Sequence, residues 1–215
     1  MKDKLKNIFL GVVVLTLIIT APQLTYSQNE TAFFNSGNTY HESGNYENAI
    51  TDYTIAIRLK QDFLEALYNR GLAYFHRGDY DRAIADYTAV LTLKPDFPEA
   101  LYNRGIAHRK MDNLELAIAD YSAALSLKPE YQNALVNRGV AYRKLGNLER
   151  AIADYTAALR IQPDYRIALY NRGALHFNRG DYDLAIAVWE AVLRITPNDA
   201  DTQQNLEKAR QQRGR

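Results

Sequence analysis

Glycine recurs every 34 residues through most of the chain, and the residues around it recur with it. Leu-Tyr-Asn-Arg-Gly ends at three of these glycines and Leu-Val-Asn-Arg-Gly at a fourth. A fixed period of this length is typical of a solenoid of stacked repeats rather than of a compact enzyme core. The glycines are Gly37, Gly71, Gly105, Gly139 and Gly173. Counting from seven residues before each of them gives five repeats: 30–63, 64–97, 98–131, 132–165 and 166–199.

Other positions of the repeat form regular columns, meaning the residues at one position of successive repeats. Position 20 is alanine throughout: Ala49, Ala83, Ala117, Ala151 and Ala185. Position 24 is a large ring: Tyr53, Tyr87, Tyr121, Tyr155 and Trp189. Position 32 is proline in the last four repeats: Pro95, Pro129, Pro163 and Pro197. With glycine at position 8, this pattern resembles the tetratricopeptide repeat.

The resemblance covers residues 30–199 and implies an all-α, right-handed superhelical solenoid of five helix-turn-helix repeats. The residues favour the same reading, because apolar side chains recur at helical spacing in both halves of each repeat. We expect the turn between the two helices to fall at Gly44, Gly78, Gly146 and Gly180, where a left-handed residue ends a helix at low cost. The third repeat has Asp112 there, a residue that visits this conformation more readily than most.

The two ends of the chain differ from the repeats. Residues 200–215 predict a capping helix, with Leu206 and Ala209 on its apolar side, followed by a frayed tail. Residues 1–27 begin with lysines, continue with an apolar stretch from Ile8 to Ile19 and then turn polar. This layout predicts a secretory signal peptide cut before Gln28, or alternatively an uncleaved N-terminal membrane anchor. We therefore expect an exported protein, periplasmic or secreted, of bacterial type.

Composition limits the kind of activity. The chain has no cysteine and a formal net charge of +1, which becomes −1 once residues 1–27 are removed. This charge gives no support to nucleic-acid binding, and a membrane contact is expected only through residues 1–27 if they stay attached. The sequence shows no phosphate loop or nucleophile elbow, and its four histidines lack a metal-binding spacing. We predict no catalytic site, no metal and no cofactor, and we interpret His108 and His176 as core residues.

Two charged columns differ from the usual family pattern. Position 7 is serine in the first repeat and arginine afterwards, and position 23 is aspartate until Val188 replaces it in the fifth. Pairing each aspartate with the arginine 18 residues later leaves no charge unmatched. We therefore predict four inter-repeat ion pairs: Asp52 with Arg70, Asp86 with Arg104, Asp120 with Arg138, and Asp154 with Arg172. The same offset predicts an apolar contact of Val188 with Leu206, and the alternative is a row of solvated charges.

In the family that the chain resembles, the first helices of the repeats line a concave groove that binds ligands. The resemblance implies that this groove contains the column of asparagines at position 6: Asn35, Asn69, Asn103, Asn137 and Asn171. Their side chains offer donors and acceptors to the backbone of an extended peptide, or alternatively satisfy local backbone groups. Aromatic residues precede them at Tyr68, Tyr102 and Tyr170. A basic centre follows at Arg109, Lys110, Arg143 and Lys144, suited to acidic side chains or a free C-terminus unless it is a solvated face.

Some family members bind C-terminal carboxylates through a clamp with lysine at position 5 and asparagine at position 9. Here Asn38 matches, but position 5 is aromatic or valine, and Glu65 and Glu99 occupy position 2, so we do not assign that clamp. We expect a non-catalytic scaffold that binds an extended peptide or a segment of a partner protein in the groove. The alternatives are a self-assembling envelope protein and a polysaccharide-binding envelope protein, the latter suggested only by the 16 tyrosines.

Overall fold

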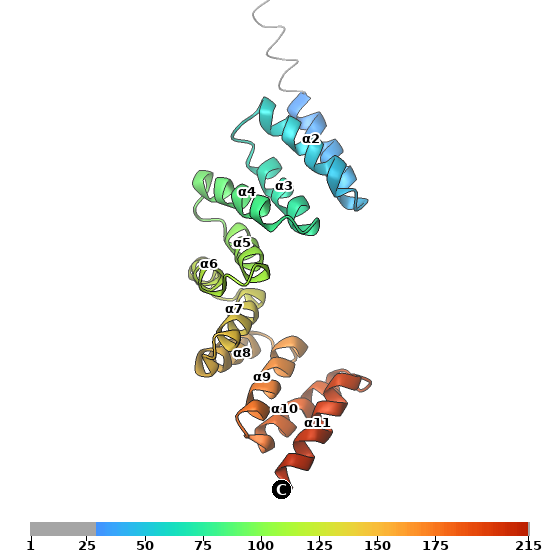
Figure 1. Cartoon of the computed structure of the whole chain (residues 1–215), viewed down its shortest axis with the longest axis vertical. Coiled ribbons are helices and arrows are strands. Elements are labelled where there is room, and N and C mark those ends of the chain that lie inside the picture. Colours follow the sequence, from blue (N-terminus) through green and yellow to red (C-terminus); the bar gives the residue numbers. More distant parts are fainter. Residues whose placement is uncertain (1–28, 215) are drawn as a thin grey trace, which may run out of the picture. The chain divides into compact units, whose positions relative to one another are not determined.

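The computed structural model describes residues 29–214, and every regular element among them is a helix. Residues 29–42 are helical, and ten further helices follow (Figure 1). They are α2 (Tyr46–Leu59), α3 (Leu64–His76), α4 (Tyr80–Leu93), α5 (Pro98–Lys110), α6 (Leu114–Leu127), α7 (Gln132–Lys144), α8 (Leu148–Ile161), α9 (Arg166–Asn178), α10 (Tyr182–Ile195) and α11 (Ala200–Arg213). The predicted all-α class of helix-turn-helix repeats is confirmed. The predicted signal peptide, residues 1–27, lies outside the described residues.

The helices form two compact parts, which meet in sequence between Leu93 and Lys94. In the first part, α2 packs on α3 and α3 packs on α4. In the second part, each helix from α5 to α11 packs on the next one along the chain. The first helices of the repeats also contact one another here, α5 with α7 and α7 with α9. None of the helices within residues 29–214 is both long enough and apolar enough to cross a membrane.

The turn inside each repeat uses a residue with positive φ, as predicted. Gly146 has a φ of 76°, and the amide of Asn147 then donates to the Tyr142 carbonyl at the end of α7. Asp112, in the third repeat, has a φ of 62° and is the one non-glycine residue with positive φ in the described chain. These turns reverse the chain so that the two helices of a repeat lie antiparallel.

The core of each repeat is a close contact between the glycine at position 8 and the ring at position 24. In the fourth repeat, a Cβ atom on Gly139 would lie 2.7 Å from Cε1 of Tyr155. In the fifth, a Cβ atom on Gly173 would lie 2.5 Å from Nε1 of Trp189. Both rings are buried. Glycine is therefore required at position 8 by space, because the ring occupies the volume of a side chain.

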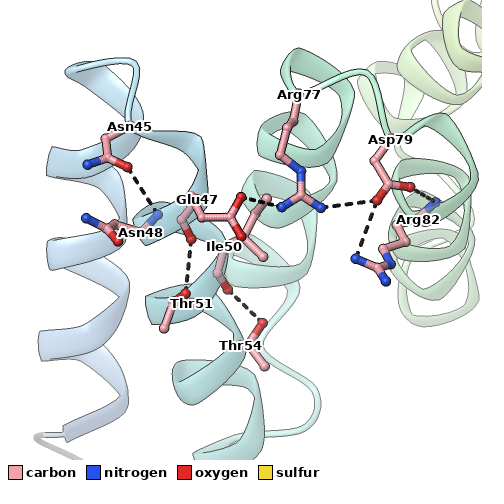
Figure 2. A network of polar contacts seen from close by, with 9 residues as sticks. All are labelled: Asn45, Glu47, Asn48, Ile50, Thr51, Thr54, Arg77, Asp79 and Arg82. Carbon is pink, nitrogen blue, oxygen red and sulfur yellow. Dashed lines mark hydrogen bonds and ion pairs between the residues drawn. The ribbon is translucent and has the colours of Figure 1, made fainter.

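Ion pairs between repeats occur at the exposed ends of the helices. Figure 2 shows Arg77, which follows α3, holding the Glu47 carboxylate near the start of α2 at 2.6 Å. The other terminal nitrogen of Arg77 lies 3.2 Å from Asp79 in the turn. At the other end of the chain, Arg213 contacts Asp183 at 3.3 Å. Such exposed pairs contribute about 0 to 1 kcal/mol each, so packing rather than charge holds the repeats together.

The last helix covers the apolar end of the fifth repeat. Asp199 caps α11 by accepting a hydrogen bond of 3.0 Å from the Thr202 amide. Leu206 and Ala209 are buried, and Leu206 belongs to the same core cluster as Val188 and Trp189. Val188 and Leu206 thus share one apolar cluster, and their direct contact stays a prediction.

We expect Gly139→Ala to destabilise the protein. Alanine gains up to about 1 kcal/mol of helix propensity over glycine, but overpacking a core costs about 1–3 kcal/mol. Urea unfolding of the variant and of the parent chain measures the difference. In a Tyr155→Leu background the added methyl group meets no ring, so the same substitution should cost less there. An equal or higher stability of Gly139→Ala in the parent chain would contradict the contact.

Candidate functional site

The candidate surface is the face of the first helices, which carries the predicted groove residues. In the second compact part it is formed by α5, α7 and α9, which contact one another directly, with α11 continuing the series after α9. Among the second helices α6, α8 and α10, direct contacts are at most marginal. Residues at positions 5 and 6 of neighbouring first helices are therefore close enough to interact.

Asn137 on α7 donates both amide hydrogens to groups within the protein. Its Nδ2 donates to the Tyr102 hydroxyl on α5 at 3.0 Å and to the Asn133 carbonyl at 2.9 Å. The amide oxygen Oδ1 accepts no hydrogen bond within the described chain. This asparagine links two repeats, and its amide oxygen is left as a free acceptor among the described residues.

The same link occurs at the end of the array through a residue that our sequence analysis missed. Asn205 on α11 donates to the Tyr170 hydroxyl on α9 at 3.1 Å. Extending the 34-residue count one step beyond the fifth repeat places Asn205 at position 6, so the period itself contained the signal. The capping helix thus shares the hydrogen-bonding pattern of the repeats.

Where the preceding repeat has no tyrosine at position 5, the asparagine bonds elsewhere. In the repeat before that of Asn171, position 5 is Val136, and Asn171 donates to the Ile167 carbonyl of its own helix at 2.8 Å. In the repeat before that of Asn69, position 5 is Phe34, and Asn69 donates to Oδ1 of Asn38 at 2.9 Å. Asn35 is exposed and Asn103 is half-buried. The alternative that these side chains satisfy local backbone groups describes the bonds of Asn137 to Asn133 and of Asn171 to Ile167, whereas Asn69 bonds to a side chain of the preceding repeat.

The aromatic column is wedged against the rings of the core. The Tyr102 ring lies 5.9 Å from that of Tyr121 and 4.8 Å from that of Tyr131, measured between centroids. Burial raises the pKa of Tyr102, and the charge of Arg109 and the hydrogen bond from Asn137 offset part of that rise. In the first part of the chain, Tyr68 lies 6.0 Å from Tyr87 in the same way. These half-buried rings therefore pack on the core.

The basic centre divides into buried and exposed side chains. Arg109 is half-buried beside the Tyr121 hydroxyl, and Arg143 stands in the same relation to Tyr155. Burial raises the pKa of Tyr155 to about 12 despite the neighbouring Arg143. The Nε atoms of both arginines are buried and have no hydrogen-bond partner among residues 29–214. The sequence did not indicate these arginine–tyrosine contacts, because arginine at position 12 reads as a surface residue.

The lysines of the basic centre reach solvent. Lys110 is exposed, and Lys144 lies 3.1 Å from Asp112 in the preceding turn with both side chains exposed. Positive charge is therefore available at the C-terminal ends of α5 and α7 at little desolvation cost.

His108 and His176 lie in the last turns of α5 and α9. His108 Nε2 is 3.9 Å from Asp120, and burial lowers the pKa of His108. His176 Nδ1 is 3.5 Å from Asp181. Both side chains are largely buried. In the part of the chain that the structure describes, no cluster of three or more histidine, aspartate or glutamate residues could hold a metal ion.

The predicted pairing of arginine with aspartate is wrong in its register. Arg138 binds Asp154 of its own repeat, with Nε and Nη2 at 2.9 and 2.7 Å from the two carboxylate oxygens. The matching pairs within repeats are Arg70 with Asp86 and Arg104 with Asp120, again at 2.7 Å for Nη2. The three aspartates are buried. Positions 7 and 23 face each other because the two helices of a repeat are antiparallel.

Two of these arginines, Arg70 and Arg138, also contact the preceding repeat, through a hydroxyl group. Arg138 Nη1 donates to Ser122 at 2.9 Å, and Arg70 Nη1 donates to Thr54 at 3.1 Å. Burial lowers the pKa of Arg70, and the hydrogen bond and charge of Asp86 outweigh it so that the pKa rises. A single guanidinium thus joins three helices, with the ion pair inside one repeat and a neutral hydrogen bond between repeats.

The predicted pairs Asp52 with Arg70 and Asp154 with Arg172 are consequently absent. Arg70 and Asp154 are engaged within their own repeats. Asp52 is half-buried, and its own repeat has Ser36 at position 7. Arg172 is half-buried, and its repeat has Val188 at position 23. Our pairing rule was chosen to leave no charge unmatched, and the structure leaves these two unmatched.

Comparison with protein families places this architecture in a known class. A model described as "Tetratricopeptide repeat" matches residues 102–166 and 136–200, and one described as "TPR repeat" matches residues 37–76 and 71–112. Together they span residues 37–200, so the chain belongs to the tetratricopeptide repeat family. No curated protein matches the sequence.

Solved structures show the same fold at low sequence identity. A tetratricopeptide repeat protein from Parabacteroides merdae is 23% identical, with a TM-score of 0.78 over 87% of this chain and 74% of that one. MamA from Desulfovibrio magneticus is 23% identical, with a TM-score of 0.75 over 80% of this chain and 97% of that one. YrrB, described as a TPR protein with an unusual peptide-binding site, is 20% identical, with a TM-score of 0.69 over 80% and 89%. These likenesses establish the fold and leave the ligand to be argued from the site.

We expect Arg138 and Asp154 to be strongly coupled in a double-mutant cycle. Arg138→Leu leaves a buried carboxylate without its partner, a loss of about 3–5 kcal/mol, and most of that loss should vanish when Asp154→Leu is also present. The control cycle combines Arg138→Leu with Asp120→Leu, where we expect near additivity, within about 0.5 kcal/mol. Urea unfolding gives both values. Stronger coupling in the control cycle would restore the inter-repeat register.

Proposed function

We propose that the protein is an exported, non-catalytic scaffold that binds an extended segment of a partner protein along the face of its first helices. Membership of the tetratricopeptide repeat family supports the coarser statement, a protein-interaction scaffold. The bound segment, the surface and the exported location are our proposal.

The observation that carries the proposal is the chemistry left at Asn137. Both of its amide hydrogens are taken by Tyr102 and Asn133, which fixes the side chain and leaves Oδ1 as an acceptor. A fixed acceptor suits the backbone N–H groups of an extended peptide, which recur along the chain whatever its sequence. The pre-ordered side chain also lowers the entropy cost of binding.

Exposed lysines at the ends of the same helices favour a segment with negative charge. Lys110 and Lys144 are exposed on α5 and α7, at the ends of the same helices that carry Tyr102 and Asn137. Charged side chains at the rim of such a surface mainly increase the rate of association and discriminate against basic partners. We therefore assign to the partner an extended segment with acidic side chains or a free C-terminus near the middle of the bound stretch.

YrrB offers a parallel, because its description attributes a peptide-binding site to a protein of the same fold. Export is supported by the sequence of residues 1–27, whose apolar stretch is shorter than the roughly 20 residues of a spanning helix. The absence of cysteine is compatible with an oxidising compartment.

We expect peptides selected from a displayed random library on the full chain to bind less tightly to Asn171→Ala and Asn137→Ala. Each lost hydrogen bond should weaken binding by about 2- to 10-fold, corresponding to 0.5–1.5 kcal/mol. Asn171→Ala is the cleaner variant, because Asn171 bonds only within its own helix. Fluorescence anisotropy of a labelled peptide measures the affinity.

The matched control is Asn113→Ser, which changes an exposed asparagine in the turn before α6. Its affinity should equal that of the parent chain. Peptide binding that is unaffected by both face variants, or equally reduced by the turn variant, would place the ligand on another surface.

The exported location has its own test. In a bacterial host, the full chain should appear in the periplasm or the medium with Gln28 as its first residue, as read by mass spectrometry of the intact protein. Replacing Leu15 with Arg interrupts the apolar stretch and should keep the chain unprocessed inside the cell. An intact chain found in the membrane fraction would favour the anchor, and one found in the cytoplasm would remove the proposal of export.

A further inference from the structure

Among residues 29–214, Arg172 on α9 is a cation without a partner, in a position where its counterparts each hold a carboxylate. It occupies position 7 of the fifth repeat, as Arg70, Arg104 and Arg138 do in the second to fourth repeats. In those repeats Nε and Nη2 bind both oxygens of a buried aspartate. Arg172 makes no hydrogen bond or ion pair within the described chain, and its Nε is buried without a partner.

Arg172 lacks an aspartate partner because Val188 stands at position 23, where the other repeats have aspartate. Other acidic side chains of the fifth repeat are engaged elsewhere. Asp181 contacts Arg179 and His176, Asp183 contacts Arg213, and Glu190 contacts Arg210. Asp154, the partner expected from the sequence, holds Arg138.

The electrostatic state of Arg172 is opposite to that of its paired counterparts. Burial lowers the pKa of Arg172, and no neighbouring acid opposes this effect. For Arg138, the hydrogen bond and charge of Asp154 outweigh burial and raise the pKa. A half-buried guanidinium that has lost water and gained no counter-charge has more to gain from an added anion than an exposed arginine has.

We propose that Arg172 is a binding site for a carboxylate supplied by a partner protein. Of its three nitrogens only Nε is sealed from solvent without a partner, so the two Nη atoms remain open to a ligand. They form a fork whose spacing matches the two oxygens of a carboxylate. Thr156 of the preceding repeat occupies the position of Ser122 and Thr54, but Arg172 makes no hydrogen bond to it within the described residues.

The site goes beyond the proposed groove and does not depend on it. Position 7 belongs to the side of the first helix that faces the second helices, because Arg138 contacts both α8 and α6. The groove residues Asn171 and Tyr170 precede Arg172 directly in sequence but bond to Ile167 and Asn205. A partner could use either surface alone.

The test follows the Nε–Hε signal of Arg172 by NMR in the ¹⁵N-labelled full chain, with acetate as the probe. Acetate added at constant ionic strength should shift this signal in a saturable way and leave the signals of Arg70, Arg104 and Arg138 in place. Arg172→Met identifies the signal by removing it. In Val188→Asp the internal carboxylate should take the site, so the response to acetate should weaken by about 10- to 100-fold, as expected for a charge-assisted bond of 1.5–3 kcal/mol.

Val188→Asn is the matched control, because it has the shape of aspartate without its charge and should keep the acetate response. If Val188→Asp loosens the fold, this control and the parent chain still decide the question. An Arg172 signal that does not respond to acetate in the parent chain would overturn the proposal.

Two peptides distinguish the source of the carboxylate. One has a free C-terminus and no acidic side chain, and the other has an amidated C-terminus and a single glutamate. Displacement of acetate by the first assigns the site to a chain terminus, and displacement by the second assigns it to an acidic side chain. If neither peptide displaces acetate, the assignment to a partner protein is wrong. Loss of peptide binding in Asn171→Ala with an intact acetate response would affect the groove proposal alone.

Discussion

The contact between a glycine backbone and an aromatic ring sets the distance between the two helices of every repeat. The rings of Tyr155 and Trp189 lie where a side chain on Gly139 or Gly173 would be. This close approach brings position 7 opposite position 23, and so allows the Arg138 fork to reach Asp154 without water between them. The buried ion pair and the alignment of the first helices both follow from this spacing.

Sequence patterns specified the helices and turns well, because those depend on neighbours within one repeat. The turn residues Gly146 and Asp112 have positive φ, as expected. The ion-pair register was not specified, since offsets of 16 and 18 residues both join the same two columns. We preferred the offset of 18 because it left no charge unmatched in the first and last repeats, and the structure contradicts it. Core packing fixes the register of the two helices of a repeat, even where a charge at the end of the array is left without a partner.

The candidate surface was predicted as a set of columns, and the structure assigns individual atoms within them. A column of asparagines does not reveal that Asn137 donates to a tyrosine of the preceding repeat while Asn171 donates to its own helix. That difference depends on whether position 5 of the preceding repeat carries a hydroxyl, which becomes relevant only once adjacent repeats are seen in contact. Asn205 was missed because the count of repeats stopped at the last glycine.

Placing the ion pair inside the repeat has a consequence for motion. Bending the array between two repeats stretches the hydroxyl contact from Arg138 to Ser122, and it leaves the bond from Arg138 to Asp154 intact. Separating the two helices of one repeat would instead expose a buried carboxylate. The contact between the second helix of one repeat and the first helix of the next is therefore the more deformable one, and each repeat moves as a stiff element. A solenoid built in this way can change its curvature without breaking a buried charge pair.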